Sequence, residues 1–304
     1  MPESVLLTGA SGFVGLPLAR ALASSGWTVH AQARRAVGPP IPGVSWHLCE
    51  LLNPAEARAL LAEIRPTHLV HAAWYVAHGS YWSAPENFLW LEASCALARQ
   101  FFANGGRRLV GIGSCAEYDW QVAPAELPWP ESRLIAPATA YGRAKAMLAQ
   151  RLFDIADAHP GAQVAWARLF HLFGPHEPVA RLVPSIVQAL LRGEVAACSS
   201  GQQVRDFAST WWVADALAAL TRSDVTGPVN VASGQGQTIA SLAQSIARLL
   251  GRPELLQLGA LPDRPDDIAV MVADTARLRD EVAYRTPAVI EADLQKLVAL
   301  SAPL

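Results

Sequence analysis

The chain of 304 residues has the length of two domains, or of one large domain with an added lobe. Its 24 basic and 26 acidic residues leave a net charge of −2 without any block of like charge, which argues against nucleic acid or a membrane as a partner. The four cysteines form no C-x-x-C pair and the N-terminal residues show no signal-peptide pattern, so we expect no structural metal, no disulfide framework and a cytoplasmic location.

The first predicted unit is a strand, a glycine turn, a helix and a second strand. A β-prone run covers 5–8, a helical pattern covers 16–25 and a second β-prone run covers 27–33, and such a β-α-β unit requires a parallel sheet. The glycines permit a tight bend, let backbone N–H groups approach a pyrophosphate and let the helix pack closely, with its positive dipole end at the phosphate. The turn residues expected to bind a dinucleotide are Gly9, Ser11, Gly12, Phe13, Val14 and Gly15.

The end of the second strand predicts which dinucleotide is bound. An NAD site usually has an acidic residue here, whereas an arginine accommodates the 2′-phosphate of NADP. Ala33 stands in the place of the acid and is followed by Arg34 and Arg35, so the sequence favours NADP. The two arginines also fit a solvated turn that binds nothing. After the next strand-like run, Glu50 and Leu51 are expected beside the adenine.

A fourth strand, 67–73, leads through a turn of small residues into an aromatic loop, 74–82. His71 has the side chain of a catalytic acid or base, but its place inside the strand indicates a structural role. The four aromatics of the loop suit a platform for a base or sugar, and they suit a lid or a subunit contact equally well. Residues expected in the pocket are Ala72 and Ala73 for the cofactor, and Trp74 and Tyr75 for the substrate.

A tyrosine and a lysine share one helix face downstream of a serine. The helix 85–103 and the strand 108–112 come first, and the strand delivers Ser114. Tyr141 and Lys145 are four residues apart, so their side chains point the same way on a helix. A phenol with a pKa of about 10 is a poor acid at neutral pH, and a nearby cation lowers that pKa. We therefore predict a site for proton transfer, with 118–138 as an active-site loop.

The remaining chain completes the sheet and adds a lobe. A sixth strand, 164–170, ends the regular alternation, and the segment 227–234 is predicted to return to the sheet. The prediction is an α/β fold: a Rossmann-type doubly wound parallel sheet with a smaller, mostly helical C-terminal substrate lobe. The Rossmann domain is expected to comprise 1–170 with 204–232 returning to it, and the substrate lobe 171–203 and 233–304.

In this order, the motifs resemble those of the extended short-chain dehydrogenase/reductases, in the nucleotide-sugar branch of the NAD-dependent epimerase/dehydratase family. The similarity covers nearly the whole chain. The segments that carry it are the turn 8–15, His71-Ala72-Ala73, Ser114 four residues before Tyr118, Tyr141 to Lys145, Arg168-Leu169-Phe170, Phe173-Gly174-Pro175, Arg205-Asp206-Phe207 and 230–234.

The resemblance implies roles for individual residues. Tyr141 would be the acid or base, Lys145 would bind the nicotinamide ribose and lower the pKa of the tyrosine, and Ser114 would position the reacting oxygen. Leu169 would contact the cofactor, while Arg205 and Arg264 would contact the sugar nucleotide. The resemblance also implies a homodimer formed by the helices 85–103 and 141–159, which agrees with the low charged content of 16%.

Departures from the family pattern narrow the chemistry. Sugar-nucleotide 4,6-dehydratases have Asp-Glu directly after the serine or threonine, where this chain has Cys115 and Ala116, and Cys115 is interpreted as a small buried residue in the substrate pocket. GDP-fucose synthase has a histidine where this chain has Arg181, so ring epimerisation at carbons 3 and 5 is unsupported. His171 replaces a substrate-binding asparagine, and we expect His171 and Arg181 in the sugar pocket.

Of the reactions considered, simple hydride transfer at one carbinol carbon is the one that these residues still support. The sequence favours an NADP-dependent reductase of a nucleotide-linked 4-keto-6-deoxy sugar, because NADPH supplies net reduction. The alternative is a nucleotide-sugar 4-epimerase with retained NAD. A third reading, a non-catalytic NADP-binding sensor, fits less well because Ser114, Tyr141 and Lys145 are all present.

Overall fold

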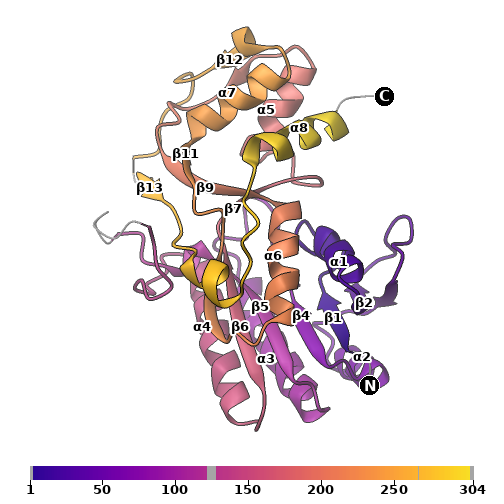
Figure 1. Cartoon of the computed structure of the whole chain (residues 1–304). Coiled ribbons are helices and arrows are strands. Elements are labelled where there is room, and N and C mark those ends of the chain that lie inside the picture. Colours follow the sequence, from indigo (N-terminus) through magenta and orange to yellow (C-terminus); the bar gives the residue numbers. More distant parts are fainter. Residues whose placement is uncertain (1–2, 122–127, 266, 302–304) are drawn as a thin grey trace.

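A seven-stranded sheet forms the larger part of the computed structural model, which describes residues 3–121, 128–265 and 267–301 (Figure 1). Every strand pairing in this sheet is parallel. The spatial order is β10-β6-β5-β4-β1-β2-β3, so the chain order reverses beside β1 and leaves a crevice where ligands bind in such folds. The strands are β1 (Ser4–Thr8), β2 (Thr28–Ala33), β3 (Val44–Leu48), β4 (His68–His71), β5 (Arg108–Ser114), β6 (Gln163–Leu169) and β10 (Gly227–Val231).

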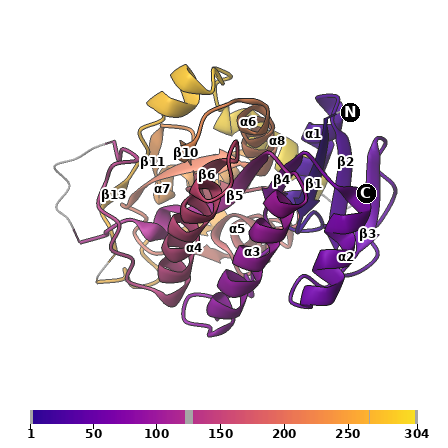
Figure 2. The same ribbon diagram turned by 90° about the horizontal axis from the view of Figure 1, so that it is seen from below.

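Helices cover both faces of the sheet (Figure 2). One face carries α1 (Gly15–Ser24) and α6 (Thr210–Arg222), and the other carries α2 (Pro54–Ile64), α3 (Glu86–Ala103) and α4 (Ala140–Asp157). Leu18 and Leu217 pack with Val5 in the first core, and Leu91 and Leu148 pack with Leu69 in the second. The central strands β1, β4, β5 and β6 are buried almost along their whole length, as expected for a doubly wound sheet with helices on both faces.

A smaller lobe lies over one end of the sheet (Figure 1). Phe173, Ile186 and Ile246 belong to its separate core. Its helices are α5 (Leu182–Leu191), α7 (Ile239–Leu249) and α8 (Ile290–Ser301), and its short strands are β7 (His171–Phe173), β8 (Ala196–Ala197), β9 (Val204–Ser209), β11 (Gly236–Thr238), β12 (Leu256–Gln257) and β13 (Val270–Met271). The segment expected to return to the large sheet divides: β9 pairs with β7, β11 and β13, while α6 and β10 join the large sheet.

Local signals explain where the helices begin. The Asn53 side chain accepts a hydrogen bond from the Ala55 N–H, and Pro54 follows in the first turn of α2, a combination typical of a helix start. The Thr139 hydroxyl caps α4 by accepting from the Gly142 N–H, which places Tyr141 in the first turn. No helix within the described residues is long and apolar enough to cross a membrane. Residues 122–127 of the predicted active-site loop lie outside the described part of the chain.

Candidate active site

A cavity of about 550 Å³ lies at the carboxyl ends of the strands, and the smaller lobe contributes part of its wall. Most of the residues predicted from sequence line it. On the cofactor side these are Gly9, Ser11, Gly12, Phe13, Val14, Gly15, Arg34, Ala72, Ala73 and Leu169; with them are Ser114, Tyr141 and Lys145; on the substrate side are Trp74, Cys115, His171 and Arg181.

The glycine turn is a cradle that side chains would fill. Gly9 has a φ of +65° and abuts the β4 turn so closely that a Cβ atom would lie 2.7 Å from the Ala73 backbone. A Cβ atom on Gly15 would lie 2.1 Å from the Gly9 carbonyl oxygen. The start of α1 can therefore lie this close to β1 only because Gly9 and Gly15 have no side chains. Such a turn fits the binding of a dinucleotide pyrophosphate at the helix N-terminus.

Six predicted residues are not among those lining the cavity. Arg205 is buried and pairs with Asp267 at 2.5 Å, and the Glu50 carboxylate accepts from the Leu52 N–H. Leu51 packs in the core with α2. The other three are Arg35 and Arg264, which are exposed, and Tyr75, whose hydroxyl lies 3.3 Å from that of Ser80. In this conformation these six side chains contact other residues of the chain or are exposed to solvent, and they do not line the cavity.

Ser114, Tyr141 and Lys145 all line the cavity. Ser114 ends β5, and its side chain lies near enough to Tyr141 to lower the pKa of the Tyr141 hydroxyl. Lys145 lies one turn further along α4, is only 3% exposed and donates to the Ile112 carbonyl oxygen at 2.8 Å. Its ammonium also lies 3.9 Å from the ring centroid of Trp74. The serine, the tyrosine and the lysine therefore face one space, as their spacing predicts.

Burial dominates the protonation of this group. Burial raises the pKa of Tyr141, and the hydrogen bond from Ser114 partly offsets it. This differs from the lowered tyrosine pKa expected from sequence, because burial of Tyr141 outweighs the hydrogen bond that lowers its pKa. Burial lowers the pKa of Lys145 to about 7, against a raising effect of Glu117. The tyrosine thus holds its proton at neutral pH, as a general acid must.

Two aromatic side chains of the loop 74–82 pack against Tyr141. The ring of Tyr81 lies 5.0 Å from the ring of Tyr141, edge to face, and the ring of Trp82 lies 5.7 Å from it. The Tyr141 N–H donates to the Trp82 carbonyl oxygen. The sequence analysis noted these aromatics without assigning them to the tyrosine, since a contact between distant segments leaves no local pattern.

His71 is held in a structural network, in agreement with the sequence interpretation. Its Nδ1 lies 2.8 Å from the Thr8 hydroxyl and its Nε2 lies 2.7 Å from the Ser94 hydroxyl. Burial lowers the pKa of His71 to about 3, so the ring stays neutral. It ties β4 to β1 and α3 and is not among the residues that line the cavity.

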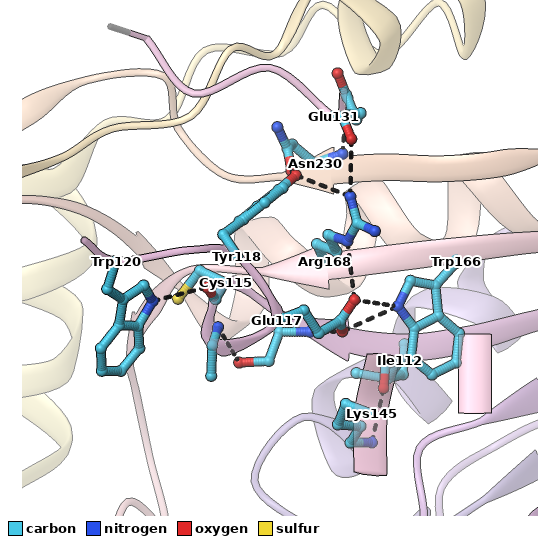
Figure 3. Close-up of polar contacts among 12 residues, drawn as sticks. Ile112, Cys115, Glu117, Tyr118, Trp120, Glu131, Lys145, Trp166, Arg168 and Asn230 are labelled. Atoms are coloured by element: carbon cyan, nitrogen blue, oxygen red, sulfur yellow. Dashed lines mark hydrogen bonds and ion pairs between the residues drawn. The ribbon is translucent and has the colours of Figure 1, made fainter. Parts of the chain in front are cut away.

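Glu117 is a buried acid that the sequence analysis did not single out. It follows Ser114 in the short turn η1 (Cys115–Glu117), and its carboxylate accepts from the Ser114 N–H at 2.7 Å. It also accepts from the Trp166 indole and pairs with Arg168 at 2.9 Å (Figure 3). The signal in the sequence is a serine three residues before a glutamate, the pattern of a capping box, which the structure contains.

The substrate side of the cavity holds three polar groups. Burial raises the pKa of Cys115 to about 12, so it remains a thiol, as expected for a small buried residue. Burial lowers the pKa of His171 to about 3, and its Nε2 has no hydrogen-bond partner among the described residues. Arg181 is held by Glu177 at 3.1 Å. A neutral imidazole and an oriented guanidinium therefore face the cavity together.

Comparison with known proteins identifies the family. The sequence pattern of the NAD dependent epimerase/dehydratase family matches residues 5–232. The chain belongs to this family. The match spans the glycine turn, Ser114, Tyr141 and Lys145, so the family pattern and the cavity coincide. The chain is therefore a member of the extended short-chain dehydrogenase/reductases, as its motifs indicate.

Relatives of known activity are distant. The chain is 28% identical to a dTDP-6-deoxy-L-talose 4-dehydrogenase (NAD(P)(+)) of Kitasatospora kifunensis, over 86% of this chain and 84% of that protein. It is also 28% identical to UDP-glucuronic acid decarboxylase 1 of Xenopus tropicalis, and it spans 61% of the length of that relative.

Solved structures share the fold along almost the whole chain. A UDP-N-acetylglucosamine 4-epimerase of Methanobrevibacter ruminantium, solved with UDP-N-acetylmuramic acid, has a TM-score of 0.86 at 25% identity, with 98% of both chains covered. A UDP-glucose 4-epimerase of Thermotoga maritima has a TM-score of 0.85 at 19% identity, again with 98% of both covered.

Proposed function

We propose that the protein is an NADP-dependent reductase of a nucleotide-linked 4-keto-6-deoxy sugar. The observation that carries the proposal is the Ser114 and Tyr141 hydroxyl pair, beside Lys145, in a cavity with no acid directly after the serine. Cys115 and Ala116 offer no acid and base for elimination, so hydride and proton transfer at one carbon is the chemistry that these residues support. The Kitasatospora relative, a 4-dehydrogenase named for a 6-deoxy sugar, supports this class.

The residues of the chain then have distinct tasks. A nicotinamide cofactor, when bound, supplies the hydride. The Ser114 hydroxyl holds the keto oxygen at carbon 4, and Tyr141 gives its proton to that oxygen as the alcohol forms. The Lys145 ammonium stabilises the phenolate that remains, and His171 and Arg181 contact the sugar nucleotide. The tight glycine turn and the α1 N-terminus hold the pyrophosphate.

The NADP preference is part of the proposal. Arg34 lines the cavity directly after Gln32 and Ala33. The end of β2 therefore carries no carboxylate that could bind the ribose diol of NAD. An exposed guanidinium in this place can bind a 2′-phosphate through charge-assisted hydrogen bonds.

A nucleotide-sugar 4-epimerase is the second candidate. The fold similarity to the Methanobrevibacter epimerase over 98% of both chains favours it. An epimerase uses the same tyrosine and serine but returns the hydride to the other face of the sugar, so it consumes no cofactor. It would also retain NAD through purification.

The test is to mix the purified protein with NADPH and a panel of 4-keto sugar nucleotides while following reduced nicotinamide by its absorbance. Consumption with one of them, lost in Tyr141→Phe with cofactor affinity kept, supports the reductase. Interconversion of two sugars without consumption supports the epimerase. An undiminished rate in Tyr141→Phe contradicts both assignments.

We also propose a homodimer through α3 and α4. These helices pack side by side on one face of the sheet and expose apolar side chains, among them Leu89 at 61% and Met147 at 41%. A second copy of the same helices would cover both residues in a four-helix interface. Light scattering of the protein and of Leu89→Glu with Met147→Glu tests this: the proposal expects a dimer that the two charges dissociate, and a monomeric parent protein contradicts it.

A further inference from the structure

The end of β5 is held on two sides by buried charges. Lys145 donates to the Ile112 carbonyl oxygen at 2.8 Å (Figure 3). Glu117 accepts from the Ser114 N–H at 2.7 Å. The two bonds lie two residues apart on one strand. Because the hydroxyl of Ser114 meets Tyr141, a shift of this strand end would misplace the serine.

Trp166 stands between the two charges. Its indole N–H donates to the Glu117 carboxylate at 2.9 Å, while its ring lies 5.9 Å from the Lys145 ammonium. The space for this arrangement comes from Gly113, where a Cβ atom would lie 2.3 Å from the indole nitrogen and 2.6 Å from the carboxylate. Because Gly113 has no side chain, the Glu117 carboxylate can lie against β5 next to the active site.

The groups around Lys145 come from β4, β6, η1 and the loop 74–82, besides its own helix. Tyr141 is on the same helix and stays protonated, His71 from β4 stays neutral, and the rings of Trp74 and Trp166 carry no charge. Glu117, from η1, is the acid whose charge favours the ammonium. Without a negative charge nearby, a lysine this deeply buried loses its proton readily.

We infer that Glu117 is a positioning residue of the active site: its carboxylate fixes Ser114 at the end of β5 and supplies a negative charge that favours the ammonium form of Lys145. The role of the ammonium in turnover rests on the proposed function. The charge relation between Glu117 and Lys145 does not. A purely structural role for the Glu117–Arg168 pair would make no difference to the lysine.

The sequence offers a direct measurement, because Lys145 and Lys296 are its two lysines. With lysine labelled by ¹³C at carbon ε, NMR follows each amine through a pH titration, and Lys296→Arg assigns the two signals. Lys296 is exposed on α8 and serves as the internal reference. In Glu117→Gln we expect the Lys145 midpoint to fall by about one pH unit, because the neutral amide no longer favours the ammonium.

Two further variants separate charge from position. Glu117→Asp keeps the charge but shortens the reach to the Ser114 N–H, so its Lys145 midpoint should stay near that of the parent protein while turnover falls. Tyr118→Phe disturbs the distal end of the same network, where Arg168 donates to the Tyr118 hydroxyl, and should leave the Lys145 midpoint unchanged.

Glu117→Gln leaves the Arg168 guanidinium buried without its carboxylate, and this can prevent folding. The double variant Glu117→Gln with Arg168→Met removes both charges and gives the same test. An unchanged Lys145 midpoint in whichever of these variants folds overturns the inference. If the Lys145 midpoint falls in these variants but the parent protein reduces no keto sugar, the inference about Glu117 is supported and the proposed function is refuted.

Discussion

Tyr118→Phe probes the polar network that holds the strands behind the active site. The change removes one oxygen from a fully buried ring, and the ring contact with Trp129 stays. Burial raises the pKa of Tyr118, so the hydroxyl is protonated and donates to the Asn230 Oδ1 atom at 2.6 Å. It also accepts from Arg168 at 3.1 Å. After the change, Arg168 keeps Glu117 and the Glu131 carbonyl oxygen, whereas Asn230 Oδ1 loses this donor.

The expected cost follows from that lost donor. A buried acceptor left without its hydrogen bond costs about 1–3 kcal/mol, and we take about 2. An unfolding entropy of about 2.1 cal/mol/K per residue gives about 0.6 kcal/mol/K for this chain, so the Tm should fall by about 3 °C. The assay is differential scanning calorimetry beside Tyr75→Phe, whose hydroxyl makes an exposed contact with Ser80 and should change the Tm by less than about 1 °C. Equal Tm values for the two variants would refute the reasoning.

Two other predictions concern the cofactor. Arg34→Ser should raise the KM for NADPH by about 10–100-fold, because a charge-assisted hydrogen bond contributes about 1.5–3 kcal/mol, and should leave the KM for NADH unchanged; equal effects on both cofactors would contradict the assignment of Arg34. Gly15→Ala places a Cβ atom 2.1 Å from the Gly9 carbonyl oxygen and should weaken NADPH binding at least about tenfold by overpacking, as measured by fluorescence titration. Gly38→Ala, where a Cβ atom meets nothing within 4 Å, is its control. Equal NADPH affinity in the two variants would contradict the assignment of the glycine turn as the pyrophosphate-binding site.

The sequence predicted the sheet and most of the cavity wall because both depend on local patterns. The glycine turn, the Asn53 cap and the four-residue spacing of Tyr141 and Lys145 each have a physical meaning within one segment. The parallel sheet followed from the alternation of strands and helices. The seven-stranded parallel sheet confirms the predicted fold, and most of the predicted site residues line the cavity.

The contacts that sequence reasoning missed join distant segments. Glu117 meets Trp166 and Arg168 on the neighbouring strand, and Tyr81 meets Tyr141 across 60 residues of chain. The pairing of β9 with the smaller sheet also depends on partners far along the sequence. Burial is the other hidden quantity: it reverses the expected direction of the Tyr141 pKa, which a count of nearby charges does not reveal.

The central claim is that hydride passes to carbon 4 of a keto sugar while Tyr141 supplies the proton. The most direct measurement uses NADPH deuterated at carbon 4 of the nicotinamide, with the product sugar nucleotide analysed by mass spectrometry and NMR. The account predicts one deuterium per product, at carbon 4 of the sugar, and one NADP formed for each. A product without deuterium at that carbon, or interconversion of sugars with no oxidised cofactor released, would contradict it.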